Sequence, residues 1–187
     1  MKTTEFVRKA GCSILAEIGV GIGDTSEAFA RYLNGRGELH LFDFAEKVQS
    51  VKARLLERGY RNIVAHGNSR KIYDDYNWSL MKVLRASSTP VFEYVYLDGA
   101  HTWHHDALAY FLVDRLLKIG GFIEFDDYGW SHMASPTVNP RIFPFTQEAF
   151  TEEQITTCQV GLVIDLLVKR DARYRTIVTN RIYEKLG

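Results

Sequence analysis

The sequence has few cysteines, no long apolar run and no apolar leader. Cys12 and Cys158 are isolated and lack paired spacing, so we expect two free thiols rather than a disulfide framework. No stretch reaches the ~18 uninterrupted apolar residues of a membrane span. Residues 1–6 lack the apolar core of a signal peptide. These absences exclude a disulfide-stabilised secreted domain and a membrane partner, and they favour a cytoplasmic location.

The chain also has no net charge, because 23 Lys and Arg residues balance 23 Asp and Glu residues. No overall field therefore attracts nucleic acid, and we expect no nucleic-acid partner. Internal repeats and low-complexity tracts are absent as well. A length of 187 residues with 46% hydrophobic content suits one compact domain with a sizeable core. We expect a single domain over residues 1–187.

What the sequence does contain is a run of alternating glycines, Gly19, Gly21 and Gly23, directly after the apolar residues 14–18. A periodic segment, 25–33, follows and predicts a helix, so the glycines form a turn between a buried strand and a helix N-terminus. Glycine tolerates positive φ and lets a ligand approach the main chain. The helix start offers free N–H groups and a positive dipole end. A nucleotide-like cofactor is predicted at this turn.

Three features bear on which nucleotide binds there. A dinucleotide fingerprint requires a glycine at position 24, which is Asp24. Glu17, just before the first glycine, would repel a pyrophosphate but would suit a cationic, amino-bearing cofactor. Asp43 ends the second predicted strand, 20 residues after Gly23, where a carboxylate can accept from ribose hydroxyls. Asp43 as a cap of the next helix is the alternative.

Strand and helix patterns alternate along the rest of the chain. The predicted strands are 14–18, 38–44, 63–66, 91–97, 122–125, 173–179 and 180–185, and the predicted helices are 25–33, 45–58, 72–86, 104–117 and 154–169. We expect an α/β fold with one Rossmann-like, doubly wound, mostly parallel seven-stranded sheet that ends in an antiparallel hairpin. Residues 1–13 form a short polar lead. The segment 128–150 holds three of the four prolines and is too long for a plain connection, so it predicts a substrate loop or lid.

The pattern Glu17-x-Gly19-x-Gly21-x-Gly23 resembles the first motif of class I S-adenosylmethionine-dependent methyltransferases. In that family the glycine turn lies against the methionine part of the cofactor. The junction after the third strand often meets the adenine, which implies a contact from Asn68 or Ser69. A glycine turn that only packs a helix on a sheet is the alternative for the turn. A simple loop with a helix cap explains residues 68–69 equally well.

Carboxylates end the fourth and fifth predicted strands: Asp98 on one, and Asp126 with Asp127 on the other. Three carboxylates that converge at one sheet edge are costly unless a cation neutralises them. Oxygen ligands favour a hard divalent ion such as Mg²⁺. The alternative is that Asp127 caps the following turn and Asp98 faces solvent.

The sequence 98–103, Asp-Gly-Ala-His-Thr-Trp, together with Gly120-Gly121 and the run Asp126-Asp127-Tyr128-Gly129, resembles the metal-dependent sugar O-methyltransferases related to macrocin O-methyltransferase. The similarity covers about residues 12–130. It implies that Asp98, Asp126 and Asp127 hold the metal, that Asp98 also meets the cofactor, and that His101 is the base, with Asp98 as the alternative base. The implied substrate is a hydroxylated small molecule, a sugar or glycoside.

Other readings stay open at this point. The family usually carries N-terminal helices that cover the cofactor, and only about 13 residues precede the first strand here. The cover must then come from 128–150 or from a partner subunit of a homo-oligomer. His101, His104 and His105 have helical spacing, but zinc would need a further nitrogen or sulfur ligand. A non-catalytic cofactor-binding regulatory or scaffold protein and an NAD-binding oxidoreductase are the rival functions.

Overall fold

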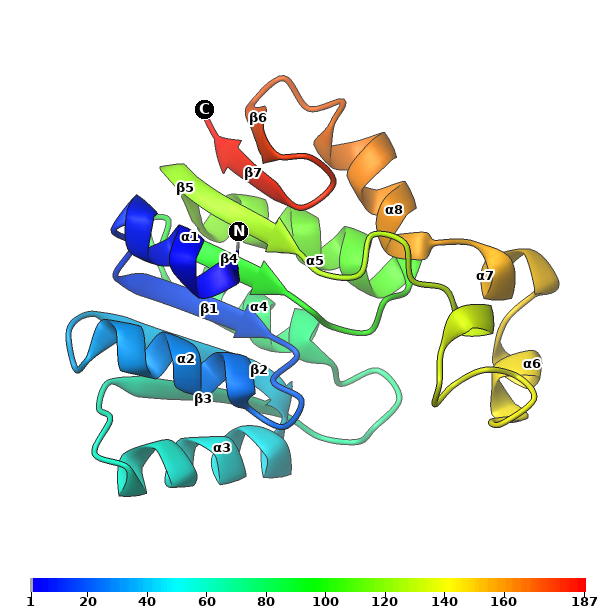
Figure 1. The fold of residues 1–187 in the computed structure, drawn as a ribbon, viewed down its shortest axis with the longest axis horizontal. Coiled ribbons are helices and arrows are strands. Elements are labelled where there is room, and N and C mark those ends of the chain that lie inside the picture. Colours follow the sequence, from blue (N-terminus) through cyan, green and yellow to red (C-terminus); the bar gives the residue numbers. More distant parts are fainter. Residues whose placement is uncertain (1) are drawn as a thin grey trace.

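The computed structural model describes residues 2–187 and contains one seven-stranded sheet in the order β3-β2-β1-β4-β5-β7-β6 (Figure 1). The strands are β1 (Ile14–Ile18), β2 (Glu38–Phe44), β3 (Ile63–Asn68), β4 (Phe92–Leu97), β5 (Leu117–Phe125), β6 (Tyr174–Val178) and β7 (Ile182–Lys185). The first five run parallel, and β7 pairs antiparallel with both β5 and β6. The predicted sheet and its C-terminal hairpin are confirmed.

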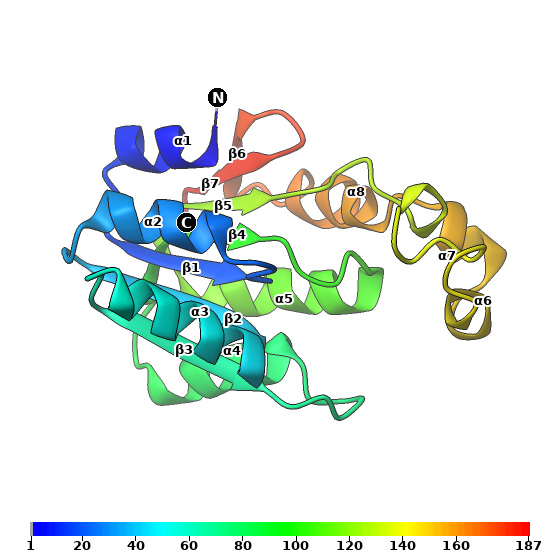
Figure 2. The same cartoon turned by 60° about the horizontal axis from the view of Figure 1, so that its bottom comes forward.

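Helices cover both faces of the sheet (Figures 1 and 2). One face carries α1 (Thr3–Ala10), α2 (Asp24–Leu33) and α3 (Ala45–Glu57). The other face carries α4 (Tyr76–Ala86), α5 (Trp103–Leu116), α8 (Gln159–Val163) and η2 (Ile164–Val168), which continues α8 as a π-helix. Within residues 2–187, no helix is long and apolar enough to cross a bilayer.

The two cores follow from the alternation of side chains along the strands. On β4, Tyr94 packs toward α1 and α2, whereas Val95 packs toward α4 and α5. On β2, Leu41 and Phe42 divide in the same way. Because both faces are covered, nearly every central strand position is apolar, which explains why the sequence reads as continuous apolar runs. This packing fixes the carboxyl ends of β1, β2 and β4, where the site lies.

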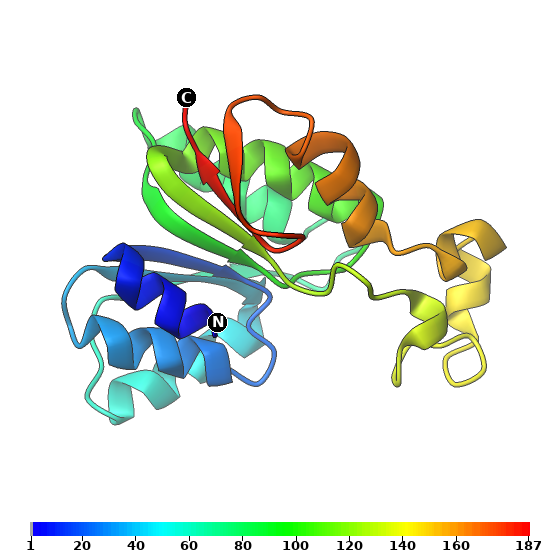
Figure 3. The same ribbon diagram turned by 45° about the horizontal axis from the view of Figure 1, so that its top comes forward.

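A lobe projects from the sheet beyond the carboxyl end of β5 (Figures 1 and 3). It contains η1 (His132–Ala134), α6 (Phe145–Ala149) and α7 (Glu152–Thr156). The predicted loop 128–150 therefore has short helical turns of its own. Residue 1, which belongs to the predicted domain 1–187 and to the predicted polar lead 1–13, lies outside the described residues. Most of the rest of that lead forms α1.

Three predicted boundaries are wrong. Helix α4 begins at Tyr76 rather than at residue 72, because the Asp75 side chain accepts from the backbone N–H groups of Asn77 and Trp78 and caps the helix there. The predicted helix 154–169 is broken near Cys158 into α7, α8 and η2. Strand β5 begins at Leu117, where the chain pairs with β4 around a register shift.

Candidate functional site

The three glycines of the turn all have positive φ, but they serve different purposes. A Cβ on Gly19 (φ 87°) would lie 1.8 Å from the Asp98 carbonyl oxygen. A Cβ on Gly23 (φ 86°) would lie 2.8 Å from Val51 of α3. These two glycines are thus required by packing. At Gly21 (φ 48°) a Cβ would meet no atom of residues 2–187 within 4 Å. The open side of the turn is therefore at Gly21.

A cavity of about 360 Å³ lies beside this turn. Its walls come from the carboxyl ends of four strands and from the first turns of α4 and α5, and its lining residues are Gly19, Gly21, Asp43, Phe44, Lys47, Asn68, Asp75, Tyr76, Asp98, Gly99, Ala100 and His105. The volume falls in the range of small-molecule sites. Five of the predicted cofactor residues meet in this cavity.

Hydrogen bonds hold the Asp43 carboxylate beside the glycine turn. Its Oδ2 accepts from the Val20 N–H at 3.0 Å and lies 3.4 Å from Lys47 Nζ, and its Oδ1 accepts from the Phe44 N–H at 2.7 Å. The carboxylate therefore joins the turn to the end of β2. As expected from its place at a strand end, it lines the cavity.

Asn68 lines the cavity and, among the described residues, has one unsatisfied acceptor. Its Nδ2 donates to the Asp74 carbonyl at 2.8 Å and to the Ser69 carbonyl at 3.2 Å, so the amide orientation is determined. Its Oδ1 is buried and has no hydrogen-bond partner within residues 2–187. A buried acceptor of this kind calls for a donor. Ser69 is exposed, does not line the cavity and hydrogen-bonds within its own loop.

Glu17 lies beneath the turn rather than on the cavity wall. Its side chain is almost fully buried and accepts from the Ser26 hydroxyl of α2. Burial raises the pKa of this carboxyl to about 8. Its predicted contact with the cofactor stays a prediction.

A second cluster adjoins the cavity and shares Asp98 with it. Oxygen atoms of Asp98 and Asp127 and a ring nitrogen of His101 lie within 4.8 Å of one another. His101 Nε2 is 3.2 Å from Asp98 Oδ1 and 3.0 Å from Asp127 Oδ2, but it is not aligned for a hydrogen bond with any group of residues 2–187. The nitrogen thus faces the gap between two carboxylates. The Asp126 carboxylate instead accepts from the Tyr96 hydroxyl at 2.7 Å.

Burial and the neighbouring charges of the cluster shift the pKa values of His101 and Asp127. Burial lowers the pKa of the His101 imidazole, but interaction with Asp98 and the charges of Asp106 and Asp127 outweigh burial, so the net shift is upward. Burial raises the pKa of Asp127, as do the neighbouring carboxylates of Asp126 and Asp98, against the effect of His101. Charge is therefore concentrated here in a way that a cation would relieve.

Aromatic rings continue from the cluster into the lobe. The Trp130 ring lies 5.0 Å from the His101 ring and 4.9 Å from the His132 ring, and His132 lies 4.3 Å from Phe150. His104 and His105, on α5, do not belong to the cluster. His105 instead bonds Thr102 at 2.7 Å and lies 3.3 Å from Asp75. Within the described chain, the three-histidine arrangement considered for zinc does not form.

Sequence reasoning missed several cavity residues, namely Phe44, Lys47, Asp75, Tyr76 and His105. Phe44 and Lys47 had a signal, since they directly follow the recognised Asp43 at a strand end. Tyr76 had none in the predicted helix 72–86, where its spacing fitted an ordinary core position.

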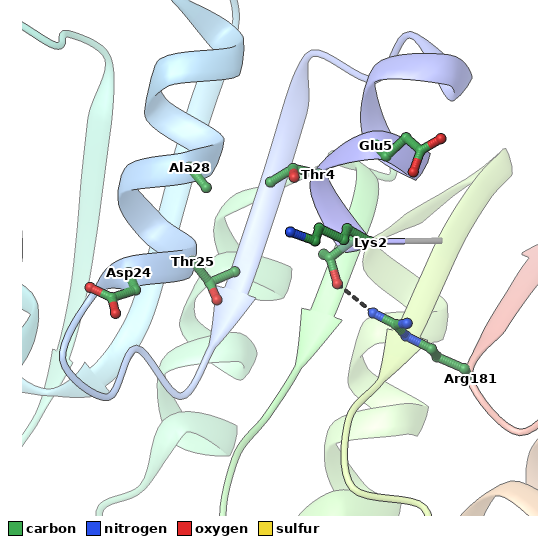
Figure 4. Close-up of a pocket in the computed structure, with 8 residues that line it drawn as sticks. Lys2, Thr4, Glu5, Asp24, Thr25, Ala28 and Arg181 are labelled. Atoms are coloured by element: carbon green, nitrogen blue, oxygen red, sulfur yellow. Dashed lines mark hydrogen bonds between the residues drawn. The ribbon is translucent and has the colours of Figure 1, made fainter.

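A larger hollow of about 680 Å³ lies elsewhere, between α1 and α2 (Figure 4). Lys2 and Thr4 face Thr25 and Ala28 across it, and Arg181 closes one end through a 2.7 Å hydrogen bond to Thr3. It is wide open to solvent, and neither Gly21 nor any residue of the carboxylate cluster lines it. The smaller cavity is the better candidate because it meets both the glycine turn and Asp98.

This sheet order, with a glycine turn after β1 and an acidic residue at the end of β2, defines a class I methyltransferase fold. Residues 16–128 match a family described as a methyltransferase domain, and the chain belongs to that family. A comparison with curated proteins found no match. The resemblance to class I S-adenosylmethionine-dependent methyltransferases is confirmed.

Solved structures share the fold at low identity. The O-methyltransferase TomG from Streptomyces achromogenes, in complex with SAM, is 18% identical with a TM-score of 0.63. An O-methyltransferase from Bacillus cereus, in complex with SAH, is 14% identical with a TM-score of 0.65. In each case the similarity covers 98% of this chain and 78% of the other. SAH-bound PaMTH1 of Podospora anserina is 13% identical, with a TM-score of 0.62 and coverage of 98% and 75%.

Proposed function

We propose that the protein transfers a methyl group from S-adenosylmethionine to a hydroxyl of a small molecule, with assistance from a divalent cation. The observation that carries this proposal is the position of Asp98. Asp98 lines the cofactor cavity and also belongs to the cluster with His101 and Asp127. A cofactor in the cavity and an acceptor at the cluster would therefore be neighbours, as an in-line methyl transfer requires.

The cavity walls suit the cofactor part by part. The open space at Gly21 would take the methionine part, and the nearby carboxylates of Asp43 and Asp98 would favour a cationic ligand. Asp43 would accept from the ribose hydroxyls. The unpartnered Oδ1 of Asn68 would accept from the 6-amino group of adenine. TomG is described in complex with SAM, which supports the same cofactor here.

The cluster fits a divalent ion, since it offers two carboxylate oxygens and one imidazole nitrogen. Carboxylate oxygens suit both Mg²⁺ and Mn²⁺, and of the two the transition ion Mn²⁺ more readily accepts an imidazole nitrogen. A bound ion would supply Lewis-acid stabilisation of an acceptor oxygen. Asp98 and Asp127 are its proposed ligands. His101 has two alternative roles, as the third ligand or as the base that takes the hydroxyl proton while Asp126 completes the ligand set.

The aromatic row suits a hydroxylated acceptor such as a sugar or glycoside. Trp130 offers a flat apolar surface beside His101, and C–H groups of a sugar ring pack well on such a surface. The lobe that follows carries exposed Ile142, Phe143 and Phe145, which would cover a bound acceptor if the lobe closed. We propose that 128–150 acts as this lid.

The test is a transfer assay with methyl-labelled S-adenosylmethionine and a panel of sugars, glycosides and catechols. Transfer to the oxygen of at least one acceptor is expected, with loss in EDTA and recovery in Mn²⁺ or Mg²⁺. Undiminished transfer by metal-stripped protein in EDTA would contradict metal assistance. Binding of S-adenosylhomocysteine without transfer to any acceptor, even with metal, would favour the non-catalytic rival.

A further inference from the structure

A buried polar pair joins Tyr76 of α4, in the cavity wall, to Asp106 of α5, which does not line the cavity. The Tyr76 hydroxyl donates to Asp106 Oδ1 at 2.7 Å, and the two residues are only 8% and 2% exposed. Neither belongs to the cluster of Asp98, His101 and Asp127. Buried hydroxyl and carboxyl groups are costly unless they are satisfied, so this pair needs a reason to be here rather than an apolar contact.

The same hydroxyl reaches the segment that carries the cluster. The Ala100 N–H donates to Tyr76 Oη at 3.3 Å. Ala100 lies between Asp98 and His101, the cavity-side and lobe-side members of the cluster. Next to it, a Cβ on Gly99 would lie 2.8 Å from Tyr76 Oη, so the segment and the tyrosine are in close contact. One hydroxyl therefore joins the middle of segment 98–101 to the start of α5.

The starts of α4 and α5 form a rigid support for this bridge. Asp75 caps α4 and lies 3.3 Å from His105 Nε2, and Asn77 Nδ2 donates to the His105 carbonyl at 3.1 Å. The Asp106 N–H in turn donates to the Thr102 carbonyl at 2.9 Å. Because both helix starts are fixed to each other, the Tyr76 hydroxyl has little freedom to move. A shift of segment 98–101 away from α4 would weaken the hydrogen bond from the Ala100 N–H to Tyr76.

The bridge matters because segment 98–101 holds a strained conformation. His101 has φ of 57°, in the left-handed region, and such a residue persists only where its surroundings hold it. The ring of Tyr76 also lines the cofactor cavity with Gly99 and Ala100. A ligand in the cavity would therefore contact both the tyrosine and the segment that the tyrosine holds.

We propose that Tyr76 and Asp106 are positioning residues that fix segment 98–101, so that occupation of the cofactor cavity sets the placement of Asp98 and His101. The coupling to the cofactor rests on the proposed function, whereas the bridge itself is a property of the ligand-free protein. Tyr76 acts through Ala100, and Asp106 acts through Tyr76.

The test is amide exchange at Ala100, followed by NMR, in Tyr76→Phe. This change keeps the ring in the cavity wall and removes only the hydroxyl. Ala100 exchange should accelerate about tenfold, the factor for a lost hydrogen bond of ordinary strength. The ring signals of His101, assigned by their loss in His101→Gln, should shift. S-adenosylhomocysteine should slow Ala100 exchange in the parent protein and have little effect in Tyr76→Phe.

The matched control is Tyr110→Phe. Tyr110 is also buried, lies on α5, and donates to a carboxylate, Asp171, at 3.2 Å, away from the cavity. It should lose a comparable amount of stability and keep the Ala100 exchange rate and the His101 signals of the parent. Equal behaviour of the two Tyr→Phe variants would overturn the proposal.

Two further variants separate positioning from stability. Asp106→Asn keeps an acceptor for the tyrosine and should keep slow Ala100 exchange. Tyr76→Phe combined with Asp106→Leu removes both polar partners, so it should regain stability while Ala100 still exchanges rapidly. Slow exchange in that double variant would also overturn the proposal. Failure of the parent protein to bind S-adenosylhomocysteine would instead contradict the cofactor assignment and leave the ligand-free measurement valid.

Discussion

His101 Nε2 lies 3.0 Å from Asp127 Oδ2, and both residues adopt left-handed backbone conformations, with φ of 57° and 56°. Such conformations cost about 1–3 kcal/mol each for residues other than glycine. The two residues meet because β4 and β5 are parallel neighbours in the sheet and bring the segments that follow them to the same edge. The strain is concentrated where the imidazole meets two carboxylates, and the predictions below concern this edge of the sheet.

Gly21→Val should abolish binding of S-adenosylhomocysteine, because the new side chain enters the space that the turn leaves open. Thermal shift measures this directly, since a ligand that binds the folded state raises its melting temperature. Gly35→Val is the matched control, because Gly35 also has positive φ and an open Cβ position among the described residues, but lies away from the cavity. It should keep the shift. A shift with NAD alone would point to the dehydrogenase rival.

Asn68→Ala should weaken binding of S-adenosylhomocysteine about tenfold through the loss of a buried acceptor for the 6-amino group. The analogue S-inosylhomocysteine carries a carbonyl in place of that group. Its carbonyl oxygen would face the Asn68 Oδ1, and two acceptors cannot hydrogen-bond to each other. The parent protein should therefore discriminate strongly between the two ligands, and Asn68→Ala should discriminate weakly. Calorimetry gives both affinities. Ser69→Ala is the control, and equal discrimination by Asn68→Ala and the parent would contradict the role of Asn68.

Glu17 predicts how stability depends on pH. Its folded pKa of about 8 lies above the ordinary value of 4.5 for a glutamate, so its contribution to stability is full below pH 4.5 and is lost as the pH rises toward 8. Glu17→Gln removes that loss. The variant should gain on the order of a few kcal/mol relative to the parent between pH 5 and pH 8. Denaturant unfolding at several pH values measures the gain, and Glu57→Gln, at an exposed position, should show none. A pH-independent difference for Glu17→Gln would contradict the expectation.

His101→Ala should lower kcat by about 10²–10⁴ if His101 is the base, with little change in cofactor affinity. The concentration of metal that the variants require distinguishes a metal ligand from a base at His101. If His101 is a metal ligand, His101→Ala needs much more Mn²⁺ for half-maximal activity, whereas Asp126→Asn does not. If His101 is the base, Asp126→Asn needs much more Mn²⁺ for half-maximal activity, whereas His101→Ala does not. Near-normal kcat in His101→Ala, with an unchanged metal requirement, would leave the histidine a structural role and make Asp98 the better candidate for the base.

The fold was predictable because its signals are local. The glycine turn, the carboxylates at strand ends and the alternation of apolar runs each occupy a few consecutive residues. The start of α4 was less predictable than the other helix starts, since Asp75 caps the helix through two hydrogen bonds to backbone N–H groups, and no local pattern favoured it over the apolar Ile72. The break near Cys158 depends on tertiary contact, because Gln159 Oε1 accepts from the Trp103 N–H at the start of α5.

The site was predictable as a set of residues but not as an arrangement. Asp126 and Asp127 are adjacent in sequence, and only the backbone turn at Asp127 directs one carboxylate to His101 and leaves the other with Tyr96. Tyr76 enters the cavity wall through the packing of α4 against α5, which no local pattern reports.

The most direct test of the account is calorimetric titration of Mn²⁺ into metal-stripped protein saturated with S-adenosylhomocysteine. One ion should bind per chain in the parent protein, and binding should be lost in both Asp98→Asn and Asp127→Asn. Glu57→Gln, an exposed change outside the cavity and the cluster, should bind the ion normally. Mn²⁺ binding that is equally tight in Asp127→Asn and the parent, or absent from the parent, would contradict a metal site shared with the cofactor cavity.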